Sequence, residues 1–99
     1  MILTWNARSG HLSLSEPLLA QLSYPHLLIV ERVGDDGLIL YQVGDLRISP
    51  DAKARKVNYP RRAKPRLSIG EEAAVALGLV DGRYRARVEG SAIVATVWR

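Results

Sequence analysis

The fold is decided by a stretch of thirteen residues that occurs twice in the 99-residue chain. The first copy reads His11-Leu12-Ser13-Leu14-Ser15-Glu16-Pro17-Leu18-Leu19-Ala20-Gln21-Leu22-Ser23. The second copy lies 55 positions later and reads Arg66-Leu67-Ser68-Ile69-Gly70-Glu71-Glu72-Ala73-Ala74-Val75-Ala76-Leu77-Gly78. Four of the thirteen residues are identical, and most of the others keep their polarity. Self-similarity at a fixed offset indicates a fold built from two copies of one unit.

Each copy predicts a short strand followed by a short helix. Leu12-Ser13-Leu14 and Leu67-Ser68-Ile69 alternate apolar and polar residues, as half-buried strands do. Ser15 and Gly70 then stand where a helix N-cap belongs, and glutamate occupies the first turn that follows. Both helices have only about two turns, so they depend on packing against the rest of the chain.

Further predicted strands surround each copy. Two apolar stretches flank a turn after each helix, at 27–33 and 38–43 in the first half and at 84–88 and 92–98 in the second. One more strand precedes each copy, at 2–6 and at 56–59. A unit of this size cannot bury a core alone, so the two halves should pack together. We therefore predict a mostly β fold, a small barrel with two short helices and an internal pseudo-two-fold repeat. It forms one compact domain over residues 1–99, with repeats at about 1–45 and 54–99 joined by a basic linker.

The positive charge of the chain is concentrated in its middle. The whole protein has a formal charge of +4. Residues 47–66 carry eight basic residues against one acid, a net charge of +7, whereas the other 79 residues carry six basic and nine acidic residues, a net charge of −3. Such a cluster is typical of phosphate binding, because cations near phosphates release condensed counterions.

A longer run around the second copy resembles a known DNA-binding family. It reads Lys64-Pro65-Arg66-Leu67-Ser68-Ile69-Gly70-Glu71-Glu72-Ala73-Ala74-Val75-Ala76-Leu77-Gly78-Leu79-Val80-Asp81-Gly82 and continues through Val88-Glu89-Gly90-Ser91-Ala92-Ile93-Val94. The run contains, in this order, a basic residue, an alternating strand, a short helix closing on Leu-Gly-Leu, a glycine turn and a hairpin with Glu-Gly. This pattern resembles the AbrB/SpoVT/MazE swapped-hairpin family, closely over about 56–97 and more loosely over 2–43.

The resemblance implies a swapped-hairpin barrel that binds double-stranded DNA. One chain would carry both interlocked units, as in tandem MraZ-like proteins, and a further pairing into a homodimer stays open. Family members contact DNA through basic residues of the strand-loop-strand ahead of the helix, which match Arg8, Arg61, Arg62, Lys64 and Arg66 here. Lys53, Arg55 and Lys56 would contact flanking phosphates. We therefore expect a transcriptional regulator whose DNA contacts are concentrated in the second half of the chain.

The sequence does not favour an enzyme. It has no cysteine and no phosphate-binding or dinucleotide-binding glycine pattern, and His11 and His26 stand far apart, so we expect no catalytic residue, cofactor or metal site. Toxin-neutralising members of the family use an acidic C-terminal tail; because the chain stops at Arg99 after its last predicted strand, we expect no toxin partner. The absence of a leader or membrane-length apolar run predicts a cytoplasmic protein.

Two further features keep other interpretations open. An apolar strand edge such as Leu38–Tyr41 would make the barrel a non-enzymatic protein-interaction or assembly module, with an incidental basic segment. Arg83, Arg85 and Arg87 alternate with less polar residues, which we interpret as a solvated outer strand face. Salt separates the two functions, because DNA binding weakens steeply as salt rises and apolar association does not.

Overall fold

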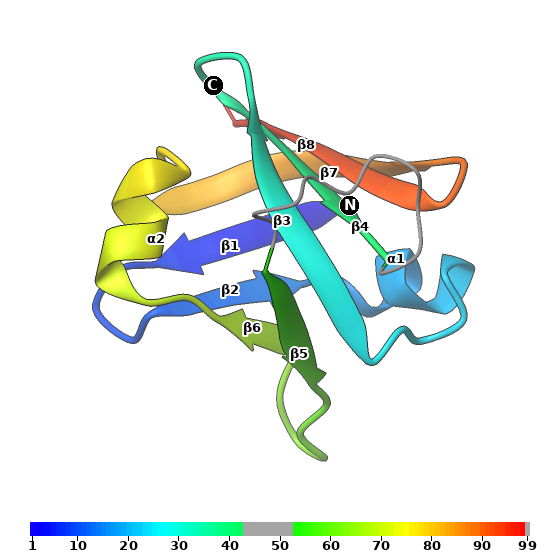
Figure 1. The fold of residues 1–99 in the computed structure, drawn as a ribbon. Coiled ribbons are helices and arrows are strands. Elements are labelled where there is room, and N and C mark those ends of the chain that lie inside the picture. Colours follow the sequence, from blue (N-terminus) through cyan, green and yellow to red (C-terminus); the bar gives the residue numbers. More distant parts are fainter. Residues whose placement is uncertain (43–52, 99) are drawn as a thin grey trace.

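The structure, a computed structural model, describes residues 1–42 and 53–98. In these residues, eight antiparallel strands close into a barrel that carries two short helices (Figure 1). The first half holds β1 (Ile2–Asn6), β2 (His11–Leu14), α1 (Glu16–Gln21), β3 (Leu27–Val33) and β4 (Gly37–Tyr41). The second half holds β5 (Ala54–Asn58), β6 (Arg66–Ser68), α2 (Glu71–Ala76), β7 (Gly82–Glu89) and β8 (Ala92–Val97). The predicted mostly β barrel with two short helices is confirmed.

The order of strands around the barrel interleaves the two halves. It runs β1-β2-β6-β5-β3-β4-β8-β7, and β7 pairs with β1 to close the ring. Every strand therefore pairs with one strand of its own half and one of the other half. Exchanging each of β1–β4 with its counterpart in β5–β8 gives the same ring, read in the opposite direction. A pseudo-two-fold axis therefore passes between β2 and β6 and between β4 and β8. The predicted linker falls mostly on residues 43–52, outside the described residues.

Alternating side chains fill the barrel. One residue in two along each strand points inward, as the period of a strand requires. The fully buried members of this core include Leu3, Leu12, Leu40, Leu67 and Ile93, which come from five different strands. A second, smaller apolar cluster lies on the opposite side of the sheet, where Ile29, Tyr41 and Ala92 are buried on the outer face of β3, β4 and β8.

The two helices lie on opposite sides of the barrel (Figure 1). Leu18 and Leu19 anchor α1 in the main core, and Ala74 does the same for α2. The sequence favours Ser15 as a side-chain N-cap, but its hydroxyl makes no cap hydrogen bond. Instead, Ser15 Oγ accepts the Ile2 N–H at 3.0 Å and donates to the Ile2 carbonyl at 2.9 Å. The serine therefore ties the start of α1 to β1 and satisfies backbone polar groups of the half-buried Ile2.

The β3–β4 turn brings two backbones unusually close together at Gly37. This glycine pairs with Val33 across the turn, and a Cβ atom added to it would lie 2.6 Å from the Val33 carbonyl oxygen. That oxygen belongs to the backbone and cannot rotate away. By contrast, a Cβ atom at Gly70, ahead of α2, would have nothing within 4 Å.

We expect Gly37→Ala to destabilise the protein by about 1–3 kcal/mol, because the hairpin must distort to relieve the contact. Gly70→Ala is the matched control and should change the free energy of unfolding by less than ~1 kcal/mol, because glycine contributes modestly as an N-cap. Urea denaturation of both variants measures the difference. Equal stabilities of the two variants would contradict the close approach at Gly37.

The predicted apolar strand edge at Leu38–Tyr41 is wrong. β4 pairs with β3 on one side and with β8 on the other, so it lies inside the closed sheet. Leu38, Leu40 and Tyr41 are also buried. The run of apolar residues in this stretch reflects burial on both faces of β4, because Leu38 and Leu40 belong to the main core and Tyr41 to the smaller outer cluster. No helix in residues 1–42 and 53–98 has the length and apolar character needed to cross a membrane.

Candidate nucleic-acid interface

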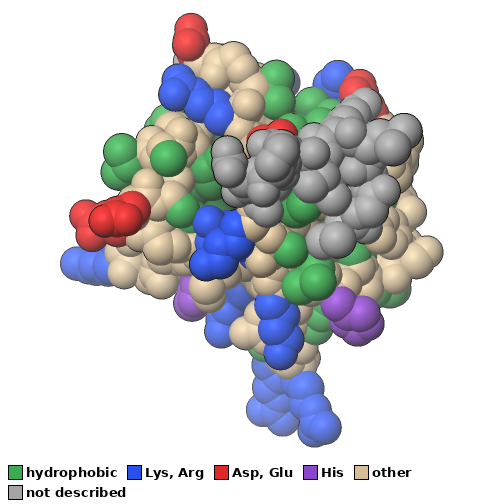
Figure 2. Space-filling model, in the orientation of Figure 1, with side chains coloured by type: hydrophobic (Ala, Val, Ile, Leu, Met, Phe, Trp, Pro, Cys, Tyr) green, Lys and Arg blue, Asp and Glu red, His purple; other side chains and the backbone are tan. Residues whose placement is uncertain are grey.

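The loop between β5 and β6 (residues 59–65) projects beyond the barrel and gathers basic side chains (Figures 1 and 2). Arg61, Arg62 and Lys64 are all exposed. Together with the start of α1 they line a groove of about 540 Å³, in which Glu16 supplies a carboxylate. Three of the predicted DNA-binding residues thus lie together on a protruding loop that a groove of a nucleic acid could admit.

Both ends of the β5–β6 loop are anchored to the first half of the chain. At one end, Tyr59 donates its hydroxyl hydrogen to the Pro25 carbonyl oxygen at 2.6 Å, and its ring meets Tyr24 edge to face at 6.1 Å. At the other end, the carbonyl oxygen of the buried Pro65 accepts the Leu14 N–H at 2.9 Å. Burial, and then the neighbouring Tyr24, raise the pKa of Tyr59 above its usual 10.0. The Tyr59 hydroxyl therefore remains a donor at neutral pH, and this anchor is lost only as the pH rises through the raised pKa.

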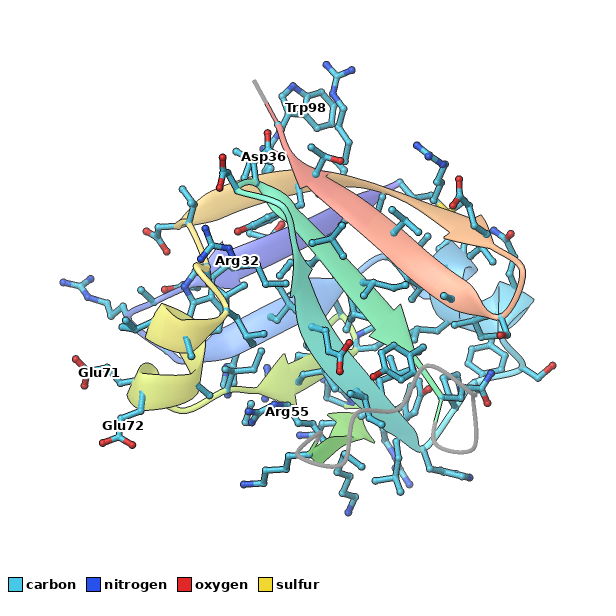
Figure 3. All side chains as sticks on the ribbon, turned by 45° about the horizontal axis from the view of Figure 1, so that its top comes forward. Arg32, Asp36, Arg55, Glu71, Glu72 and Trp98 are labelled. Atoms are coloured by element: carbon cyan, nitrogen blue, oxygen red, sulfur yellow. The ribbon has the colours of Figure 1, made fainter. Side chains whose placement is uncertain are left out.

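A second basic region lies on and before β5. Lys53 and Lys56 are exposed, and Arg55 is half-buried. They line a groove of about 360 Å³ that also includes Asn58 and Ser68. The side chains of β5 nevertheless alternate between the two faces of the sheet. Arg55 lies on the same face as the buried Val57, whereas Lys56 points outward. Figure 3 shows Arg55 near the end of the barrel that carries α2.

Arg66 belongs to a row of outward-pointing residues on neighbouring strands. It pairs in register with Asn58 of β5 and with Ser13 of β2, and Ser13 pairs with Thr4 of β1. Arg66 is half-buried, and its Nε atom is buried without a hydrogen-bond partner. The Nε atom is therefore closed to an external partner, whereas part of this half-buried residue stays accessible.

Arg8 lies at the other end of β2 from the β5–β6 loop. It is exposed in the β1–β2 turn, where its N–H donates to Asn6 Oδ1 at 3.0 Å. That turn lies beside the α2 end of β6, where the Ile69 N–H donates a hydrogen bond to the Gly10 carbonyl oxygen. The β5–β6 loop lies at the opposite end of β2, beside Leu14. The length of β2 therefore separates the two loops by ~13 Å. Arg47, the remaining cation of the basic segment, lies outside the described residues.

The structure adds three arginines that the sequence does not single out as site residues. Arg83, Arg85 and Arg87, here called the β7 arginine row, are exposed on the outer face of β7. β7 pairs with β1, so Arg83 stands opposite Thr4 and continues the row that contains Arg66. Their outward exposure agrees with the interpretation from the sequence. Their position beside β1 depends on a pairing between residues about 80 apart, which alternation along one strand does not reveal.

Acidic side chains are scarce on this side of the barrel. The five neighbouring strands β5, β6, β2, β1 and β7 contain six Lys and Arg residues but a single carboxylate, that of Glu89 at the end of β7. Glu71 and Glu72 lie on α2 and point away from the barrel (Figure 3). Within the parts of the chain that the structure describes, no three His, Asp or Glu side chains are placed to hold a metal ion. The charge of these five strands is therefore predominantly positive.

A scan against protein-family models and searches of curated proteins and of solved structures each found no match to this chain.

Proposed function

We propose that the protein binds double-stranded DNA and acts as a transcriptional regulator. The observation that carries the proposal is the protruding β5–β6 loop with three exposed cations beside a strand surface almost free of carboxylates. Non-specific DNA affinity is supplied mainly by cations that neutralise phosphates, and such a surface provides them in one region. The resemblance of residues 56–97 to swapped-hairpin DNA-binding proteins supports the same function.

The candidate residues divide into two roles. Arg61, Arg62 and Arg66 are suited to base recognition, because a guanidinium can donate two hydrogen bonds to the edge of one guanine in the major groove. Lys53, Arg55, Lys56 and Lys64 are suited to phosphate contacts, which set the position and orientation of the protein on the duplex. Arg8, at the far end of β2, would contact phosphates at the other end of the interface.

The interface is lopsided with respect to the pseudo-two-fold axis. The β5–β6 loop carries three cations, whereas the equivalent β1–β2 turn carries Arg8 alone. A symmetric protein surface suits a palindromic site, since protein symmetry and site symmetry match. We therefore propose that this barrel binds a non-palindromic site, with the β5–β6 loop providing most of the contacts.

Fluorescence anisotropy of a labelled 20-base-pair duplex, measured over a series of salt concentrations, tests this function. If five phosphates are contacted, the logarithm of the binding constant should fall with the logarithm of salt with a slope of about −4.5. No binding at low salt would overturn the proposal. A partner bound through apolar surface would show little dependence on salt, and that result would favour a protein-interaction module instead.

A further inference from the structure

We infer that the β7 arginine row is a second phosphate-binding line of the DNA interface, on the opposite side of a groove from the β5–β6 loop. The inference rests on the proposed DNA-binding function and extends it to residues of another strand. DNA would lie across the outer surface of β6, β2, β1 and β7.

The spacing of the row suits a nucleic-acid backbone. Its three arginines occupy alternate positions of one strand, so all three point outward and span ~13 Å. One strand of duplex DNA carries a phosphate about every 3.4 Å along the helix axis, so this length corresponds to roughly four phosphates. A regular line of cations is therefore matched in length to a short run of one DNA strand.

The first two arginines of the row are available to an external anion. On the strands beside β7, Arg83 faces Thr4 of β1, and Arg85 faces Ile2 of β1 and Thr96 of β8. None of these three partners is charged. Among the described residues, neither arginine forms an ion pair, whereas Arg87 binds Glu89 at 2.8 Å. Within the described part of the chain, no ion pair therefore holds Arg83 or Arg85, and both guanidiniums can accept an anion from outside.

Trp98 holds Arg85 in position. The guanidinium carbon of Arg85 lies 4.5 Å from the Trp98 ring centroid, in a cation–π contact. The backbone N–H of Trp98 donates to the Arg83 carbonyl oxygen at 2.9 Å, so the indole side chain extends from a fixed backbone position. Figure 3 shows Trp98 at the outer edge of the barrel, beyond β8. A guanidinium held in this way loses less conformational freedom when it binds a phosphate.

The barrel itself does not require these arginines. β3 is the pseudo-symmetric equivalent of β7, because β7 pairs with β1 as β3 pairs with β5. In these pairs Tyr84 faces Leu3 and Leu28 faces Arg55, so Leu28 is the equivalent of Tyr84. By this register, Leu27 and Ile29 occupy on β3 the positions that Arg83 and Arg85 occupy on β7. The same fold position thus accepts an apolar side chain, so substituting the arginines should leave the barrel intact.

The row and the β5–β6 loop are placed to contact opposite DNA strands. Arg66 and Arg83 stand at the two ends of a row over β6, β2, β1 and β7, three strand spacings or ~14 Å apart along the surface. The major groove of B-DNA is about 12 Å wide, so cations at this separation can reach the phosphates of both edges. Ser13 and Thr4 lie between them, and their short hydroxyl side chains can approach base edges.

Acrylamide quenching of tryptophan fluorescence tests whether DNA covers the row. Trp5 is buried, with 4% of its surface exposed, whereas Trp98 is 46% exposed, so quenching reports mainly on Trp98. We expect quenching of the wild-type protein to decrease when a 20-base-pair duplex saturates it at low salt. Unchanged quenching, with anisotropy showing that DNA is bound, would overturn the inference and leave the proposed function standing.

The salt dependence of the double variant Arg83→Ala/Arg85→Ala provides a second test. We expect roughly tenfold weaker DNA binding and a salt slope that is shallower by about 1.8, since each lost phosphate contact removes about 0.9. Arg32→Ala removes an exposed arginine that pairs with Asp35 away from this surface, and its slope should equal that of the wild type. A wild-type slope in the double variant would exclude the row from the interface. Failure of the wild-type protein to bind DNA would instead overturn the proposed function itself, and the inference with it.

Discussion

Reversing both charges at the tip of the β5–β6 loop, with Arg61→Glu/Arg62→Glu, is expected to abolish measurable DNA binding at physiological salt. The double variant changes the formal charge of the protein from +4 to 0 and places two carboxylates where phosphates would lie. Like charges brought together across an interface cost several kcal/mol, and ~4 kcal/mol corresponds to a roughly 1000-fold weaker complex. Anisotropy at two salt concentrations measures the loss.

The fold should survive this change, because the contacts that anchor the loop to the described residues lie at its two ends. Arg61 and Arg62 are exposed, whereas the anchors are Tyr59 and Pro65. The thermal midpoint should therefore stay within a few degrees of the wild type. The single variant Arg61→Glu has a matched control in Arg32→Glu, which makes the same charge change on β3. Equal weakening by these two single variants would show that net charge, and not the loop, determines affinity.

The sequence predicts the local elements well because each is determined by nearby residues. The apolar stretch at 27–33 ahead of a turn predicts β3 at the residues where it is found, and Gly78 adopts the left-handed conformation (φ 65°) that ends α2. β5 begins at Ala54, two residues before its predicted start, because pairing with Ile29 of β3 extends it. That extension comes from a partner strand in the other half of the chain and leaves no local pattern.

Closure of the barrel and the full extent of its basic surface cannot be read from local patterns. The apolar stretch at Leu38–Tyr41 has the same sequence pattern whether β4 lies at an edge or in the middle of a sheet. The β7 arginine row likewise has the pattern of any solvated strand. Its relation to Arg66 follows only from the pairing of β7 with β1 and of β2 with β6. The loop cations, by contrast, could be predicted because they are close together in sequence.

The junction between β2 and β6 joins the two halves on the surface proposed to bind DNA, and Leu67 is its central core residue. Leu67 is fully buried and faces Leu12 across this junction and Val57 across the β5–β6 pair. Its neighbour Arg66 points to the outside, so the packing of Leu67 holds β6, and with it Arg66, in place. Core packing at this point therefore supports both the closure of the barrel and the geometry of the interface.

Leu67→Ala is expected to reduce the free energy of unfolding by about 3–5 kcal/mol, because it removes buried methyl groups and leaves a cavity where the halves meet. A domain of this size has a total stability of about 5–15 kcal/mol, so the variant should unfold at a much lower temperature or lower urea concentration. Val75→Ala is the control: Val75 is 77% exposed on α2, and its loss should cost less than ~0.5 kcal/mol. If Leu67→Ala were as stable as Val75→Ala, β2 and β6 could not be packed against a shared core. The row from Arg66 to Arg83 would then lose its structural basis, whereas a large destabilisation supports the closed barrel on which that row depends.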